Sequence, residues 1–408
     1  MNQTIRSRIE QIKRGEIPEG YEKTPFGIFP CDWEKSTLKK LGEFAKGKGI
    51  PGEKMKNEGI PCVGYGDIYM KYNYHFNQAK SFIDRTTADE SIQVGRNTLL
   101  FTGTGETAEE IGKCVCYTGP DDIYVGGDII IFNSVEVSPV FIAYQQYLPF
   151  AIKQKAGFGQ GYSVVHIYKS DLEKLYCAYP KSKAEQEKIA EILQEQDRLI
   201  ELKEKLIEEK KKQKQYLMEV LLTGKVRLPG FTDEWEKFHL CELCSIRTGR
   251  LDANAAVENG RYPFFTCSRE ELRINKYSFN GEAILLAGNG DVGHTKYYSG
   301  KLAAYQRTYV LMDFKINPKL IKCYIDMAMP TIVQKELQGG AMPYIKLSTL
   351  EKVSFFAPND FNEQEAIIKD IELFAVDLEL LQKELEEQKR KKQSLMQLLL
   401  TGIIRVKA

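Results

Sequence analysis

One glycine turn in the first half of the chain has the residue pattern of a cofactor loop. The run FTGTG at 101–105 fits the F-x-G-x-G pattern with which methyltransferases hold S-adenosylmethionine, and it follows a strand-like stretch. However, the matching turn in the second half reads LAGNG, and the chain contains no N-P-P-Tyr/Phe string, the partner motif of amino-methyltransferases. We therefore interpret these runs as tight turns that present Thr102, Thr104 and Asn289 to a binding partner.

Cysteine and histidine residues do not supply a second catalytic pattern. Cys241 and Cys244 form a CxxC, but a zinc site needs two more ligands at close spacing, and neither Cys267 nor Cys323 offers such a pair. We expect core cysteines on a short helix instead. Of the four histidines, only His294 lies on a glycine-rich turn, where it would suit a base or a phosphate. The sequence predicts no catalytic residue and no metal site.

Basic, polar and aromatic side chains occur together in both halves, in a mixture that suits DNA. Lysine and arginine hold phosphates, whereas arginine, asparagine and glutamine read base edges. The candidate DNA contacts of the first half are Lys46, Lys48, Thr102, Thr104, Lys153, Lys155 and Tyr162. Those of the second half are Arg247, Arg250, Asn289, His294, Lys296, Arg307 and Tyr344. Each one alone also fits an ordinary surface position.

Composition limits the class of protein. The 408 residues allow two to three domains, and a net charge of +1 means that a nucleic-acid partner would need a local basic surface. Nine cysteines at irregular spacing indicate a reducing cytosol rather than a disulfide framework. The N-terminus lacks the apolar run of a signal peptide, and no apolar stretch approaches the length of a membrane span. We expect a soluble cytoplasmic protein with no membrane partner.

Two long helices must position the candidate residues, and the second helix is a copy of the first. Residues 184–222 contain neither Pro nor Gly, and a shift of 178 places 184–228 on 362–406 with 19 of 45 residues identical. Both copies begin with EQE and end with LLTG, in which Gly is the usual residue just past a helix end. The lysine-rich runs at 210–214 and 389–392 fit either a solvated helix face or a phosphate-binding end.

Both copies have the apolar spacing of a coiled coil. In the second copy, apolar residues recur in steps of four and three from Ile367 to Leu399, with Gln388 and Lys392 at the two missing places. In the first copy, we expect the seam at Ile189, Ile192, Leu199, Leu206 and Leu217, interrupted by Gln196, Lys203 and Lys210. We expect the two copies to pair antiparallel within the chain; the alternative is that each dimerises with another molecule.

Each long helix follows a globular block, and the two blocks repeat one plan. DWEK at 32–35 matches EWEK at 234–237, and TLLFTGTGE at 98–106 matches AILLAGNGD at 283–291. The sequence predicts an α+β fold, in which two mixed α/β blocks are joined by two long antiparallel coiled-coil helices as a pseudo-twofold repeat. The expected segments are 1–30 (N-terminal helix and connector), 31–182 (first block), 183–224 (first long helix), 225–361 (second block), 362–402 (second long helix) and 403–408 (tail).

This arrangement resembles the specificity subunit of type I restriction–modification systems. Each block opens near Trp-Glu and closes on Pro, and LLTGKVRLPGFTDEWE at 221–236 is especially similar to the central junction of that family. The resemblance implies two target recognition domains, each reading one half of an interrupted double-stranded DNA sequence. It also implies that the helices set the spacer and dock two methyltransferase subunits, with restriction subunits able to join. S-adenosylmethionine would then bind the methyltransferase subunit, and this chain would hold no cofactor and would not itself be an enzyme.

Two other classes of protein remain open from the residues alone. One is a coiled-coil scaffold with protein-binding domains, which would lack salt-sensitive DNA binding. The other is a self-contained DNA methyltransferase that uses the FTGTG turn, which would bind S-adenosylmethionine as a purified chain.

Overall fold

The computed structural model describes residues 3–161, 164–337 and 344–407. The chain packs as two compact units: residues 1–202 with 385–408 form unit 1, and residues 203–384 form unit 2. These units differ from the six expected segments because compactness, rather than secondary structure, defines them. Each unit contains one globular block and one part of each long helix.

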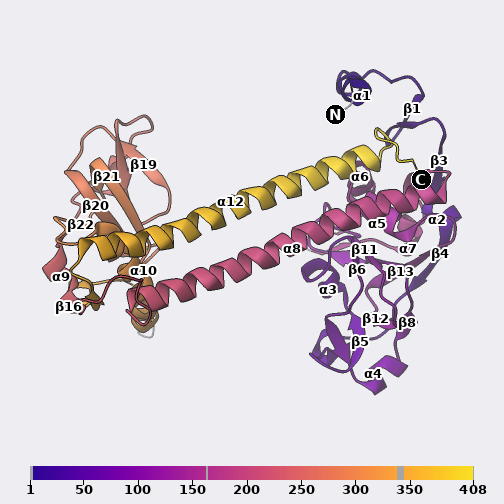
Figure 1. The fold of residues 1–408 in the computed structure, drawn as a ribbon. Coiled ribbons are helices and arrows are strands. Elements are labelled where there is room, and N and C mark those ends of the chain that lie inside the picture. Colours follow the sequence, from indigo (N-terminus) through magenta and orange to yellow (C-terminus); the bar gives the residue numbers. More distant parts are fainter. Residues whose placement is uncertain (1–2, 162–163, 338–343, 408) are drawn as a thin grey trace. The chain divides into compact units, whose positions relative to one another are not determined.

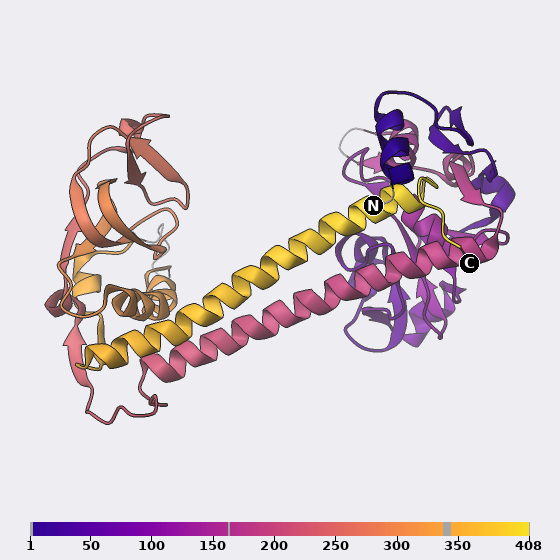
Figure 2. The same cartoon turned by 45° about the horizontal axis from the view of Figure 1, so that its top comes forward.

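Unit 1 begins with the short helix α1 (Gln3–Lys13), followed by an antiparallel hairpin of β1 (Tyr21–Thr24) and β2 (Gly27–Pro30). Figure 2 shows α1 beside the last turns of α12 (Phe361–Leu399). The Arg8 guanidinium donates to the carbonyl of Ile403 at 3.3 Å, and the Tyr21 hydroxyl donates to that of Gly402 at 2.7 Å. The N-terminal segment therefore packs on the C-terminal end of the chain.

Two sheets form the globular part of unit 1 (Figure 1). The larger sheet has the order β4-β13-β9-β11-β6 and is antiparallel except for the β6–β11 pair. Its strands are β4 (Gly42–Lys46), β6 (His75–Phe76), β9 (Thr98–Thr102), β11 (Cys114–Tyr117) and β13 (Ile129–Ser134). The smaller sheet, β7-β5-β12-β8, consists of β5 (Ile60–Val63), β7 (Ser81–Ile83), β8 (Ile92–Val94) and β12 (Ile123–Val125).

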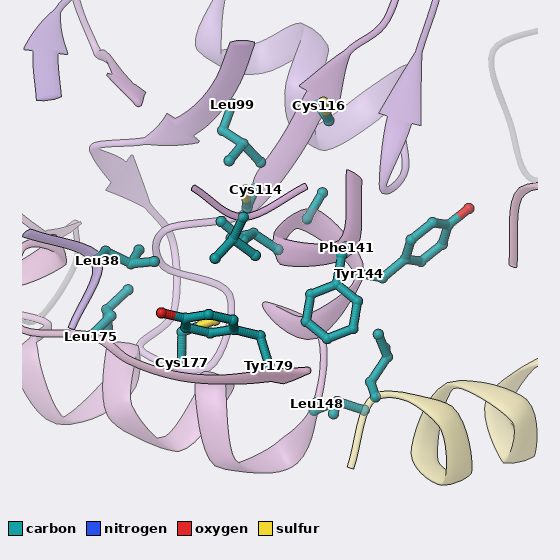
Figure 3. Packing of buried hydrophobic residues seen from close by; sticks show 14 of the residues in the cluster. Leu38, Leu99, Cys114, Cys116, Phe141, Tyr144, Leu148, Leu175, Cys177 and Tyr179 are labelled. Carbon is teal, nitrogen blue, oxygen red and sulfur yellow. The ribbon is translucent and has the colours of Figure 1, made fainter. Parts of the chain in front are cut away.

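Short elements complete this block. They are β3 (Trp33–Thr37), α2 (Leu38–Leu41), a 3-10 turn (Gly52–Lys54), α3 (Tyr65–Met70), α4 (Arg85–Asp89), β10 (Thr104–Gly105), α5 (Pro139–Gln145), α6 (Pro149–Phe158), β14 (Val165–His166), α7 (Lys169–Leu172) and β15 (Tyr176–Pro180). Every residue of β9 and β11 is buried, as in strands that are covered on both faces. Figure 3 shows Leu99 and Cys114 of these strands in one core with Phe141 of α5 and Cys177 of β15.

A six-stranded sheet in the order β17-β22-β20-β21-β18-β19 forms the globular part of unit 2. Its strands are β17 (Ser245–Thr248), β18 (Tyr262–Phe265), β19 (Glu271–Ile274), β20 (Phe279–Ala287), β21 (Thr295–Ala304) and β22 (Thr308–Met312). Around it lie β16 (Glu236–His239), α9 (Leu240–Leu243), a 3-10 turn (Ala253–Ala255), α10 (Pro318–Leu337), α11 (Leu347–Glu351) and β23 (Ser354–Ala357).

The repeat seen in the sequence corresponds to the same strand pairing in the two units. In unit 2, β17 pairs antiparallel with β22, and Thr248 lies opposite Tyr309. In unit 1, β4 pairs antiparallel with β13, and Lys46 lies opposite Ile130. In both units the next strand of the ladder, β20 or β9, leads into the glycine turn that the two halves share. The predicted mixed α/β fold with an internal repeat is confirmed.

The long helices α8 (Lys183–Leu222) and α12 run antiparallel in each unit, as the sequence predicts. In unit 1, Gln196 donates to the side-chain amide oxygen of Gln388 at 3.0 Å. In unit 2, Lys203 of α8 forms a 2.7 Å ion pair with Glu384 of α12. The structure therefore favours pairing within the chain over separate dimerisation of each helix.

The seam of α12 lies where the sequence predicts it, but that of α8 is displaced. Leu199 and Leu206 were expected on the seam, yet they are 39% and 44% exposed, whereas Leu193 and Ile207 are buried. The observed four-three steps on α8 are Ile189, Leu193, Gln196, Ile200, Lys203, Ile207, Lys210, Lys214 and Leu217. Lysines occupy three of these positions. The apolar pattern of the sequence therefore points to a neighbouring face of the helix, which carries Leu199 and Leu206.

The first glutamate of each EQE string forms an ion pair at its helix end. In unit 2, Arg227 donates to both carboxylate oxygens of Glu363 at 2.8 and 2.9 Å, and the Trp235 indole donates to the same carboxylate at 3.2 Å. In unit 1, Arg405 makes the matching pair with Glu185 at 2.7 and 2.8 Å. Both glutamates are buried, so each needs its arginine to offset the loss of hydration.

The LLTG strings end the helices where a side chain would not fit. Gly224 and Gly402 have φ of +67° and +72°, in the left-handed region that favours glycine. A β-carbon on Gly402 would lie 2.5 Å from Pro30, and one on Gly224 would lie 3.3 Å from the Trp235 ring. The strings shared by the two copies therefore build helix ends.

Candidate nucleic-acid interface

Three loops meet at one edge of the sheet in unit 2. They are residues 288–294 between β20 and β21, residues 305–307 between β21 and β22, and residues 344–346 before α11. The Gly288 amide donates to the Arg307 carbonyl at 3.0 Å, and the Ile345 amide donates to the Gly288 carbonyl at 2.9 Å. A β-carbon at residue 288 would lie 2.7 Å from that Arg307 carbonyl, so the close approach requires glycine. We name these three segments the loop edge of unit 2.

Cationic, polar and aromatic side chains line this loop edge. Arg307 is exposed, and its guanidinium carbon lies 5.7 Å from the ring centroid of Tyr344, within the range of a cation–π contact. Asn289 is half-buried in the first loop. Lys296, at the start of β21, donates to the carbonyl of Arg269 at 2.7 Å. The structure thus brings together four of the residues that the sequence singled out.

The three arginines predicted to contact DNA differ in what they already bind. Arg247 forms a 3.2 Å ion pair with Asp313. Arg250 follows β17, and the Gln306 amide of the loop edge donates to the neighbouring Leu251 carbonyl at 3.0 Å. Within the described ranges, neither Arg250 nor Arg307 has a carboxylate partner, so both keep donors for a ligand.

His294 is the last residue of the first loop of the loop edge, and it lines a pocket. The pocket has a volume of about 540 Å³, and its lining includes Arg269, Asp291, Lys322 and Asp326. Arg269 is paired with Asp291 at 2.6 Å, and Lys322 with Asp326 at 2.7 Å. Burial lowers the pKa of His294 below its usual value, which disfavours the charged imidazolium in the chain without a ligand.

Unit 1 has a matching loop edge, formed by residues 47–49, 103–105, 126–128 and 166–168. The Gly103 amide donates to the Asp128 carbonyl at 2.8 Å. The Thr104 hydroxyl lies 3.4 Å from Nδ1 of His166, and Lys48 is exposed on the loop after β4. This edge brings together Thr104 and Lys48 from the predicted set.

Two predicted DNA contacts are core residues instead. Lys155 is buried, and its ammonium donates to the carbonyls of Gly112 at 2.9 Å and Gln146 at 3.1 Å. Burial lowers the pKa of Lys155 to about 8. Thr102 is buried at the end of β9, where its hydroxyl lies 2.8 Å from that of Tyr69. Both residues hold the fold, because neither side chain reaches the surface.

The remaining predicted contacts stay predictions. Lys46 is exposed at the end of β4, next to the loop edge of unit 1, and Lys153 is exposed on α6 outside it. Tyr162 lies outside the described residues. Asp128 and His166 belong to the loop edge but were not predicted. The repeat would have found His166, since a shift of 178 carries it to residue 344.

The glycine and cysteine motifs take part in the packing of the fold. A β-carbon on Gly105 would lie 2.8 Å from the Tyr69 hydroxyl, so the FTGTG turn packs closely against Tyr69. Of the CxxC pair, Cys244 is buried but Cys241 is exposed, which corrects the expectation of two core cysteines. Within the described ranges, no three His, Cys, Asp or Glu side chains are grouped to hold a metal ion, and no helix could span a membrane.

Comparison with known proteins gives the family. The model of the type I restriction modification DNA specificity domain matches residues 30–211 and 232–390. The type I restriction enzyme EcoDI specificity subunit of Escherichia coli is 35% identical over 154 residues, which is 38% of this chain and only 34% of that protein. The MjaVIII specificity subunit of Methanocaldococcus jannaschii is 26% identical over 93% of this chain and 94% of its own length.

Solved structures share the fold. The S subunit of a type I restriction–modification system from M. genitalium has a TM-score of 0.59 at 19% identity, covering 90% of this chain and 96% of that one. A chain from a structural study of type I complex assembly has a TM-score of 0.60 at 14% identity, covering 92% and 99%. The chain belongs to the type I restriction–modification DNA specificity family, and it is a specificity subunit rather than a catalytic one.

Proposed function

We propose that the two loop edges read the two halves of an interrupted DNA sequence, one half for each unit. The observation that carries this proposal is that one backbone arrangement occurs twice with different side chains at its surface. Thr104 and His166 in unit 1 correspond to Asn289 and Tyr344 in unit 2. A shared docking geometry with unlike reading groups is what an asymmetric bipartite target requires.

The long helices are proposed to dock two methyltransferase subunits and to set the spacer between the half-sites. Exposed apolar side chains on both helices support the docking role, since such groups mark protein interfaces when they recur along one face. Leu202 and Leu206 on α8 are 54% and 44% exposed, and Leu373, Val376 and Leu380 on α12 are 62%, 52% and 54% exposed.

Catalysis is proposed to belong to the partners. The methyltransferase subunits would bind S-adenosylmethionine and methylate adenine, which requires the base to be flipped out of the stack. Restriction subunits could then join the same assembly. The complex is proposed to work in the cytoplasm, since nine cysteines at irregular spacing indicate a reducing compartment.

Mapping of methylated adenines across the host genome tests the proposal. Cells with the chain should show one interrupted methylated motif, which is lost when the chain is deleted and the methyltransferase subunit is kept.

Inserting four helix-forming residues after Glu201 adds about 6 Å of rise to the helix. Since DNA advances about 3.4 Å per base pair, the spacer should lengthen by roughly one to two base pairs. A methylated motif that survives deletion of the chain would contradict its role in specificity. An unchanged spacer in the insertion variant would mean that the helices do not set the spacer length.

A further inference from the structure

Asp128 and Arg307 occupy the same place in the two units. Gly103 donates its amide proton to the carbonyl of Asp128 at 2.8 Å, and Gly288 donates to that of Arg307 at 3.0 Å. The carbonyls of Gly103 and Gly288 in turn accept from the amide of Ile167 at 3.0 Å and from the matching amide in unit 2 at 2.9 Å. The two residues are therefore equivalent by hydrogen bonding as well as by position in the repeat.

The residue that follows each of them confirms this equivalence. Ile129 accepts from the amide of Gly47 at 2.9 Å, and Thr308 accepts from that of Gly249 at 3.2 Å. At both glycines a β-carbon would lie far inside van der Waals contact with a backbone carbonyl oxygen, 2.1 Å from that of Gly126 at Gly47 and 1.9 Å from that of Ala304 at Gly249. The backbone around the two positions is thus constrained in the same way.

The side chains at these equivalent positions carry opposite charges. Both are exposed, and neither has an ion-pair partner among the residues that the structure describes. Arg307 lies 5.7 Å from the ring centroid of Tyr344, whereas Asp128 lies at a pocket of about 570 Å³ whose rim is rich in glycine, including Gly126 and Gly127. Each charge is therefore held at the surface without being neutralised by the fold.

Opposite charges at one docking position exclude a shared phosphate contact. A carboxylate repels the DNA backbone, so a position that carried phosphate in both half-sites would not hold Asp128. Base edges in the major groove accept either charge, because guanine presents two acceptors, O6 and N7, and cytosine presents an N4 amino donor. The position shared by Asp128 and Arg307 is thus suited to base edges.

We propose that Arg307 and Asp128 are specificity-determining residues at equivalent positions of the two half-sites. Arg307 donates two hydrogen bonds to O6 and N7 of a guanine, and Asp128 accepts a hydrogen bond from N4 of a cytosine. This inference rests on the proposed function, because it assumes that each loop edge faces one half-site.

The test for Arg307 is the methylated motif of the complex that contains Arg307→Gln, mapped across the host genome. Gln suits adenine rather than guanine, and a good bidentate pair discriminates roughly 5- to 150-fold between bases. One guanine of one half-site should lose its preference by about that factor, while the other half-site stays the same. Arg273→Gln is the matched control, since Arg273 is an exposed arginine of β19 outside the loop edge and is already paired with Glu271 at 3.6 Å, and it should leave the motif intact.

The test for Asp128 is the same mapping with Asp128→Asn. One cytosine in the opposite half-site should lose its preference, with adenine gaining, because Asn suits the N6 and N7 edge of adenine. Asp122→Asn is the control: Asp122 is also exposed in unit 1, but its carboxylate accepts from Gln93 at 2.7 Å. That variant should keep the parent motif.

Three outcomes would overturn the inference. Arg307→Gln could reduce methylation evenly at all sites, with a weaker salt dependence of DNA binding, which is the behaviour of a phosphate contact. Second, either variant could leave the methylated motif unchanged. Third, the base that loses its preference could differ from the proposed one, which is guanine for Arg307 and cytosine for Asp128. A chain whose whole first block is replaced separates this failure from that of the proposed function: if the replaced block alters one half-site while both point variants do not, only the inference falls.

Discussion

Lys155 is a buried cation whose proton affinity links the folding of unit 1 to pH. Its pKa is lowered to about 8 by burial, whereas an unfolded lysine titrates near 10.4. Between these values the unfolded chain binds more protons than the folded chain, so this residue makes folding more favourable as pH rises. Its unfavourable contribution is fully present below about pH 8 and is relieved above it.

Lys155→Met should remove this pH dependence. From pH 7 to pH 9, the stability of the parent chain relative to the variant should rise by about 1 kcal/mol, which follows from the two pKa values. Urea unfolding of both chains at each pH measures the difference, and the comparison cancels the thiols and tyrosines that titrate in the same range. An equal difference at both pH values would mean that Lys155 stays charged in the folded state.

Burial is also what limits prediction of the site from the sequence. Lysine and threonine are mostly surface residues, so Lys155 and Thr102 looked available, and only the packing of α6 and β9 shows that they are not. Arg307, Tyr344 and Asn289 could be named from residue type and the glycine turn. Their convergence depends on backbone hydrogen bonds between loops far apart in the chain, which no local pattern reports.

At the scale of the elements, a charged network ties the helix pair to the block of unit 1. Asp197 of α8 forms an ion pair with Lys392 of α12 and accepts from the Tyr144 hydroxyl at 2.6 Å. The Lys392 ammonium lies 3.4 Å from the ring centroid of Tyr74, and its side chain is only 8% exposed. Such a pair fixes the register of the two helices, because a shift of either one would leave a buried charge alone.

A double-mutant cycle tests this network. Asp197→Ala should lower stability by about 3–5 kcal/mol, because it leaves the Lys392 ammonium buried without a partner. Adding Lys392→Met should restore much of that loss, since both charges are then gone. The control is Lys214→Met, at the corresponding place in the repeat, where Ala375 replaces the acid and the change should stay within about 0.5 kcal/mol. Thermal unfolding measures the stability of the parent chain, the two single variants and the double variant. If the losses from Asp197→Ala and Lys392→Met simply add in the double variant, the two residues are not coupled.

The elements themselves were the most predictable part of the chain. Long Pro-free and Gly-free runs with EQE and LLTG at their ends gave both helices within about a turn. The seam of α8 was less accessible, because Lys203, Lys210 and Lys214 lie on it, and lysine can bury its aliphatic stem while its ammonium stays near solvent. Which face of α8 carries the seam depends on the residues of α12 that these lysines contact. Those contacts are known only from the structure of the paired helices.

At the scale of the whole molecule, one structural plan is used twice with different surfaces. The helix ends are alike, since Arg227 with Glu363 and Arg405 with Glu185 make the same ion pair. The loop edges keep the same backbone bonds, but their exposed side chains differ. The residues that build the fold are therefore repeated, whereas the exposed side chains that would contact DNA differ. This is the pattern expected of a subunit that reads two independent half-sites.

The most direct measurement of this central claim is the methylated motif after replacement of residues 33–169 by the corresponding block of a related specificity subunit. Both helices, the two arginine–glutamate pairs and all of unit 2 stay unchanged in this chimaera. Mapping of methylated adenines in the host should show a new sequence in one half-site, with the other half-site and the spacer length as before. A chimaera that changes both half-sites, or neither while methylation persists, would contradict independent reading by the two units.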